Sequence, residues 1–111
     1  MSNIEFSERL QQLPPNPMNA QEITLHIAVN LGRLGRWALE GKEARLKQFL
    51  TETEDYLKQL EDAPKKTRFL KTFESFKRVF AILKDNIRLD RDWAESAFTW
   101  ANILTHRAKL A

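Results

Sequence analysis

One segment restricts the fold of this chain more than any other: a ladder of bulky apolar side chains between residues 69 and 87. The steps of the ladder alternate between four and three residues. Its members are Phe69, Phe73, Phe76, Phe80, Leu83 and Ile87. At 100° per residue they all lie within about 40° of one line along an α-helix. So regular an aromatic stripe is typical of a core, so we predict a helix over residues 65–88 with structural phenylalanines.

Start and stop signals delimit three more helices of similar length. Asn19 and Glu22 form a capping-box pattern at the start of a helix over residues 19–40. Heptad-spaced leucines predict the next helix over residues 42–62. Asp90 is placed to cap a last helix that continues towards the C-terminus. The connections between these segments are short, and short connections favour antiparallel neighbours.

The sequence therefore predicts an all-α fold, an antiparallel up-down-up-down four-helix bundle over residues 19–111. Residues 1–18 are predicted to form a separate N-terminal arm. The arm contains a short helix over residues 3–13 and a proline-rich connection, with prolines at positions 14, 15 and 17. Proline cannot continue a helix, so this connection should be extended.

The residue composition argues against disulfides, metal binding and nucleophilic catalysis. The chain has no cysteine, which excludes disulfides and thiolate metal sites. His26 lies four residues after Glu22, but the inward stripes are apolar and carry no Glu-x-x-His pair, so we expect no metal and no cofactor. The serines lack the glycine context of a nucleophile elbow. We therefore expect a protein that is not an enzyme and has no small-molecule substrate.

Neither a secretion signal nor a membrane span is evident. The first ten residues carry charges and no apolar core, unlike a signal peptide. No apolar run approaches the roughly 20 residues that cross a bilayer. We expect a soluble, cytoplasmic protein that does not bind membranes.

The predicted helix over residues 19–40 is apolar on two sides, so it should be central in the domain or shared with another subunit. Asn30 interrupts its main stripe and requires a buried partner. Ala28, Gly32 and Gly35 form a side of small residues on which another helix could pack closely. The two glycines with their neighbouring arginines could instead form an anion-binding turn or a local break in the helix.

The predicted helix over residues 65–88 has two unlike faces beside its phenylalanines. The basic face consists of Lys66, Lys77, Lys84 and Arg88. The uncharged face consists of Thr72, Ser75, Val79, Ile82 and Asn86. Residues 64–91 hold nine Lys/Arg against three Asp/Glu, whereas residues 40–62 hold four against seven. This contrast indicates that the two helices pair their charges, or that an acidic partner binds from outside.

Two hypotheses on function follow. In the first, the chain is a non-enzymatic helical module for protein–protein contact, self-associating or part of a complex, because its apolar surface exceeds what one bundle core uses. The predicted contact residues are Leu25, Gly32, Gly35, Val79 and Ile82. In the alternative, the chain binds nucleic acid or another polyanion. The predicted contact residues are then Lys66, Lys71, Lys77, Arg78, Lys84 and Arg88.

Overall fold

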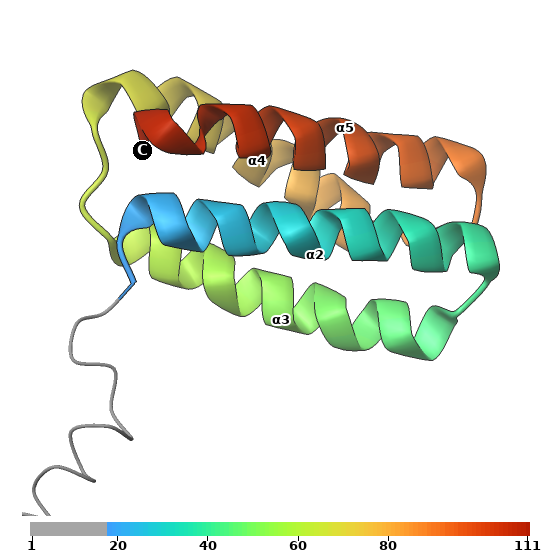
Figure 1. Ribbon diagram of the computed structural model, residues 1–111. Coiled ribbons are helices and arrows are strands. Elements are labelled where there is room, and N and C mark those ends of the chain that lie inside the picture. The colour runs from blue at the N-terminus through green and yellow to red at the C-terminus, as the bar shows by residue number, and fades with distance from the viewer. Residues whose placement is uncertain (1–17) are drawn as a thin grey trace, which may run out of the picture.

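Four antiparallel α-helices follow one another in up-down-up-down order in the computed structural model, which describes residues 18–111 (Figure 1). They are α2 (Ala20–Glu40), α3 (Glu43–Asp62), α4 (Thr67–Asp85) and α5 (Arg91–Arg107). A 3-10 turn, η1 (Ala108–Leu110), closes the chain. The predicted four-helix bundle is thereby confirmed. The predicted arm over residues 1–18 lies outside the described residues, apart from its last position.

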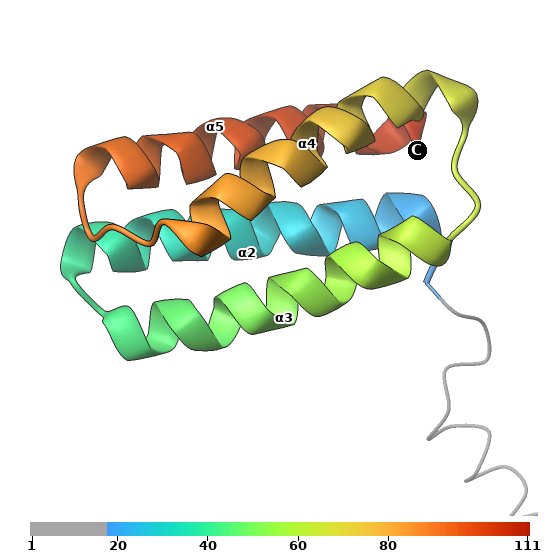
Figure 2. The same cartoon turned by 180° about the vertical axis from the view of Figure 1, so that it is seen from behind.

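Helix α2 is the centre of the bundle. It packs between α3 and α5, and α4 crosses the other side of the molecule obliquely (Figure 2). Its core stripe is almost completely buried and comprises Ile23, Ile27, Leu31, Leu34 and Ala38. No helix within residues 18–111 is long and apolar enough to cross a membrane.

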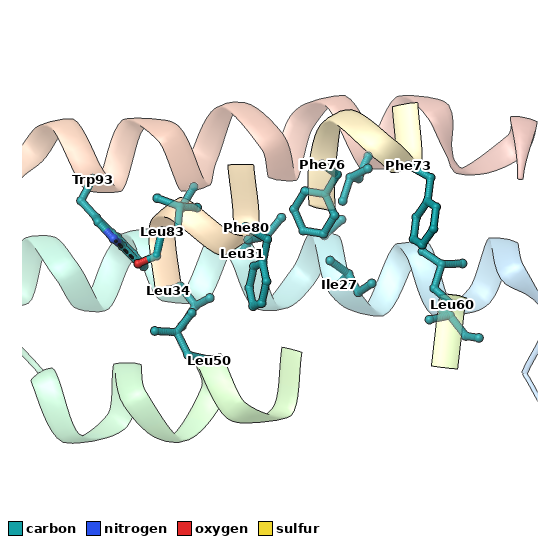
Figure 3. Packing of buried hydrophobic residues seen from close by; sticks show 14 of the residues in the cluster. Ile27, Leu31, Leu34, Leu50, Leu60, Phe73, Phe76, Phe80, Leu83 and Trp93 are labelled. Carbon is teal, nitrogen blue, oxygen red and sulfur yellow. Dashed lines mark hydrogen bonds between the residues drawn. The ribbon is translucent and has the colours of Figure 1, made fainter. Parts of the chain in front are cut away.

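The phenylalanine ladder of α4 fills the space between α4 and α2. Phe69, Phe73, Phe76, Phe80 and Leu83 are each 5% exposed or less. In Figure 3 the rings of Phe76 and Phe80 lie beside Ile27 and Leu31 of α2. Burial of apolar area stabilises a fold by about 25 cal/mol per Å², so these large rings supply much of the core. The ladder is structural, as predicted.

The helix ends follow from identifiable contacts. The Asn19–Glu22 capping box is present, with 2.8 Å from Glu22 N to Asn19 Oδ1. Asp90 caps α5 by accepting a hydrogen bond from Trp93 N at 2.9 Å. Gly41 ends α2 with a φ of 71°, in the left-handed region that glycine adopts without strain.

Helix α4 is shorter than the predicted helix over residues 65–88. At its start, Lys65 is not helical, because its ammonium donates to the carbonyls of Leu60, Glu61 and Ala63 at 2.6–2.9 Å and so closes α3. At its end, the Asn86 side chain donates to Ile82 O at 3.0 Å. Both are contacts of side chains with helix carbonyls, which periodicity alone does not predict.

Polar groups inside the bundle have partners. The buried Asn30 donates from Nδ2 to Glu52 Oε2 of α3 at 3.0 Å, which supplies the partner that its position required. Trp93 Nε1 donates to the Leu83 carbonyl at 3.1 Å, drawn as a dashed line in Figure 3. This bond ties α5 to the end of α4, where the chain turns from one helix to the other.

Replacing Trp93 by phenylalanine removes that donor and leaves the buried Leu83 carbonyl without its partner. We expect Trp93→Phe to lower the free energy of unfolding by about 1–3 kcal/mol in urea titrations. Trp100→Phe is the control, because Trp100 contacts Phe76 through its ring, at 5.7 Å between centroids. Equal losses in the two variants would contradict a role for the Trp93 hydrogen bond.

Candidate interaction surfaces

Three of the four cations of the basic face are engaged with acidic residues of the same chain, whereas Lys66 is exposed and forms no ion pair within residues 18–111. Lys77 pairs with Glu61 of α3 at 2.8 Å, and Lys84 pairs with Glu54 of α3. At the α4–α5 turn, Arg88 pairs with Asp90 at 2.8 Å. The charge contrast between the two helices is thus used internally, as one of the two sequence interpretations expected.

These pairs shift the protonation equilibria of their members. The hydrogen bond from Lys84 lowers the pKa of Glu54, and the hydrogen bond from Lys77 lowers the pKa of Glu61. The same two bonds raise the pKa values of both lysines. All four groups are close to solvent, so each pair is screened and individually weak. They join α4 to α3 at two points along the helices.

The uncharged face of α4 is largely directed at α5. Thr72 is buried and accepts a hydrogen bond from Arg107 Nη1 at 2.9 Å, and Val79 is half-buried against the core. Asn86 and Ile82 are the exceptions, because both are exposed. Ile82 has 62% of its surface exposed. It borders a surface cavity of about 210 Å³ at the α4–α5 turn, beside the indole of Trp93. The cavity's one cation, Arg88, is already paired with Asp90 and Asp92.

The second apolar side of α2 divides into two parts. Ala28 and Gly35 are buried, and a Cβ built on Gly35 would lie 2.5 Å from Phe98 Cε1 of α5. Gly35 therefore admits the Phe98 ring of its own chain and has no free surface for a partner. Gly32 has open space where its Cβ would be. Close helix packing thus holds for Gly35 and not for Gly32. Both glycines lie within the continuous helix α2, so neither forms the turn or the local break that the sequence also allowed.

The part of α2 left uncovered forms a second ladder, on the side away from α4. We call it the outer ladder; it consists of Leu25, Val29, Gly32, Arg36 and Leu39. Its steps are four, three, four and three residues, so its members lie on one side of the helix. Leu25, Val29 and Leu39 are 38%, 54% and 56% exposed. In Figure 1, α2 and α5 lie in front of α4, so this side of α2 faces the viewer.

Phe98 extends the outer ladder onto α5. Its ring rests on Gly35 and is still 38% exposed. Sequence reasoning selected Leu25 and Gly32 but missed Val29 and Phe98. The alternating spacing of the outer ladder was a usable signal for Val29. Phe98 carries no such signal, because only the packing of α5 on α2 brings it to Gly35.

The histidines and carboxylates form no site. His26 is exposed and stacks on Tyr56, with 5.3 Å between ring centroids. Within residues 18–111, no three His, Asp or Glu side chains are grouped so as to hold a metal ion. Comparisons with protein-family models, with curated proteins and with solved structures gave no match to the chain.

The contrast between Gly32 and Gly35 is testable by alanine substitution. Alanine favours a helix over glycine by about 1 kcal/mol, so at protein concentrations low enough for the chain to be monomeric Gly32→Ala should raise the free energy of unfolding by about that amount. Gly35→Ala should raise the free energy of unfolding by less or not at all, because the added methyl group would force the Phe98 ring to move. In a Phe98→Ala background the gain from Gly35→Ala should reappear, which a double-mutant cycle measures. An unchanged gain in both backgrounds would show that Phe98 does not rest on Gly35.

The ion pairs between α3 and α4 predict a pH dependence of stability. The pKa values of Glu54 and Glu61 are depressed in the folded state, so their stabilisation is present above their ordinary value of 4.5. It is lost as pH falls through the lowered folded values. The raised pKa values of Lys77 and Lys84 give stabilisation that is present below 10.5 and lost as pH rises beyond it.

We expect the double variant Glu54→Gln/Glu61→Gln to show a smaller drop in Tm between pH 6 and 3 than the unaltered chain, as followed by circular dichroism. The control is Glu43→Gln, which removes an ion pair with Lys47 inside α3 alone, 2.8 Å long. If the drop in Tm between pH 6 and 3 is equal in the double variant and in the control, the interhelical pairs do not stabilise the bundle.

Proposed function

We propose that the chain is a non-enzymatic helical module that works through protein–protein contact, and that its partner on the outer ladder is a second copy of itself. The observation that carries the proposal is the exposure of Leu25, Val29 and Leu39 along one side of the central helix. A helix usually presents one apolar stripe to its own core. Helix α2 has a second side that is apolar apart from Arg36, and the residues in the range 18–111 leave it exposed.

The spacing of the outer ladder suits a two-fold symmetric contact. Leu25 and Leu39 lie seven residues before and after Gly32. An antiparallel second copy centred on Gly32 would therefore place each leucine opposite a leucine of the other copy. Such a self-complementary surface is what a two-fold dimer requires. Gly32, with open space at its Cβ position, would let the two helix backbones approach closely.

Phe98 contributes the aromatic part of the surface. Large aromatic side chains often dominate the energy of an interface, and this ring is held in place from below by Gly35. Leu25, Val29, Leu39 and Phe98 are four of the large apolar residues that are exposed within residues 18–111. Burying them would gain about 25 cal/mol per Å² of apolar area. The gain favours association over continued exposure.

Light scattering coupled to size-exclusion chromatography tests the proposal. At tens of micromolar we expect the mass of a dimer, and Leu25→Glu should shift it to that of a monomer. Leu70→Glu is the matched control, because Leu70 is 40% exposed, close to the 38% of Leu25, but lies on α4. Both variants must keep the helical circular dichroism of the unaltered chain.

A strict monomer at tens of micromolar would overturn the self-association proposal. So would a dimer that Leu70→Glu dissociates and Leu25→Glu does not, because the contact would then lie on α4. A dimer unaffected by either variant would also place the contact outside the outer ladder.

A further inference from the structure

Cations that form no ion pair with any residue in the range 18–111 gather where the first turns of α4 meet the last turn of α5. Arg107 of α5 donates from Nη1 to Thr72 Oγ1 of α4 at 2.9 Å. Arg68 lies one helical turn before Thr72, and Lys71 is its neighbour in the chain. All three cations are exposed. Arg107 is therefore held against α4 by a neutral hydroxyl instead of a carboxylate, next to a turn of α4 that carries two further cations.

The cations continue along the outside of α4. Arg78 follows Lys71 at seven residues, or two helical turns, and shares its side of the helix. We call these residues the outer basic strip: Arg68, Lys71, Arg78 and Arg107. None of them takes part in an ion pair with a residue of the described range 18–111. The basic face that sequence reasoning emphasised is different, since Lys77, Lys84 and Arg88 are all paired.

Nearby carboxylates do little to compensate this charge. Glu74 is on the outside of α4, but its carboxylate is 3.4 Å from Lys77. Asp85 is at the far end of the helix. The first turn of α4 has no acidic residue, although negative charge is favoured there. Like charges held close together without counter-charges repel one another, so an anion bound to the strip would relieve this repulsion.

The shape of the strip indicates which anion. Residues 68 to 78 span about 15 Å of helix, which fits a chain of phosphates better than a single one. Hydroxyl groups accompany the cations, as they do at phosphate contacts in nucleic-acid complexes; Ser75 is one of them. Among the exposed large apolar residues of α4, Leu70 lies on the α3 side of the helix, whereas Ile82, 62% exposed, lies one turn beyond Arg78 at the end of the strip. A single exposed isoleucine is much less than the continuous apolar face of a membrane-surface helix.

We propose that the outer basic strip binds the phosphate backbone of nucleic acid without sequence preference. Arg68, Arg78 and Arg107 supply guanidinium groups, which suit paired hydrogen bonds to phosphate oxygens. Lys71 adds a point charge between them. The surface is separate from the outer ladder of α2, so this binding does not depend on self-association.

The test is fluorescence anisotropy of a labelled oligothymidylate of about 30 nucleotides, titrated with the full chain at about 50 mM and about 200 mM salt. We expect binding that weakens steeply as salt increases, because neutralised phosphates release counterions. Arg68→Gln/Arg107→Gln should weaken binding at least about ten-fold and reduce the salt dependence, by about 0.7 in log–log slope for each lost contact. The control Lys58→Gln/Arg91→Gln removes the same charge from α3 and from the other end of α5, and should change affinity far less.

Three results would overturn the proposal. The first is no binding at about 50 mM salt. The second is equal weakening by both double variants, since net charge and not the strip would then be responsible. In the third, the chain does not bind the oligonucleotide but sediments with vesicles of phosphatidylcholine and phosphatidylserine, and Arg68→Gln/Arg107→Gln abolishes this sedimentation. That result would assign the strip to anionic lipid.

Discussion

The distribution of side chains around helix α2 is the constraint on which the rest of the structure depends. Its core stripe is filled by the phenylalanines of α4, and the side with Asn30 faces α3. On the opposite flank, Ala28 and Gly35 are small enough for α5 to approach, and Phe98 takes the place of the missing Gly35 side chain. Three helices thus use three sides of α2. The fourth side, with Leu25 and Val29, is still apolar, and this makes it a candidate for binding.

Electrostatics divides α4 in a similar way. The lysines that face α3 meet Glu54 and Glu61, and these pairs orient two helices whose remaining contacts are apolar and not directional. On the side of α4 that faces α5, Thr72 accepts a hydrogen bond from a cation, Arg107. Lys71 and Arg78 lie on the outside of α4. A net charge of +3 is modest for the whole chain. Its distribution is uneven, because the lysines of α4 that face α3 are paired and the four cations of the outer basic strip form no ion pair within residues 18–111.

Features within single helices, the antiparallel order and the charge complementarity of two helices could be predicted from the sequence, whereas specific side-chain contacts between helices could not. The phenylalanine ladder, the Asn19 cap and the Asp90 cap are encoded by spacing over a few residues. The contacts of Gly35 with Phe98 and of Thr72 with Arg107 join residues 63 and 35 positions apart. Such contacts depend on how helices pack, so the periodicity of each helix does not contain them. For the same reason the predicted cation set contained paired lysines and omitted two arginines of the strip.

The two proposed surfaces would reinforce each other if both function. By helical spacing the outer ladder lies on the side of α2 opposite its core stripe, and Lys71 and Arg78 of the strip lie on the side of α4 opposite its phenylalanines. Helix α4 is behind α2 in Figure 1 and in front of it in Figure 2. A dimer formed through α2 would therefore direct its two strips away from the contact. Two weak backbone sites on one rigid particle bind a long strand more tightly than either alone, because the second contact forms within the complex. In such a dimer, association through α2 would raise the affinity for long nucleic acid without adding any new contact to it.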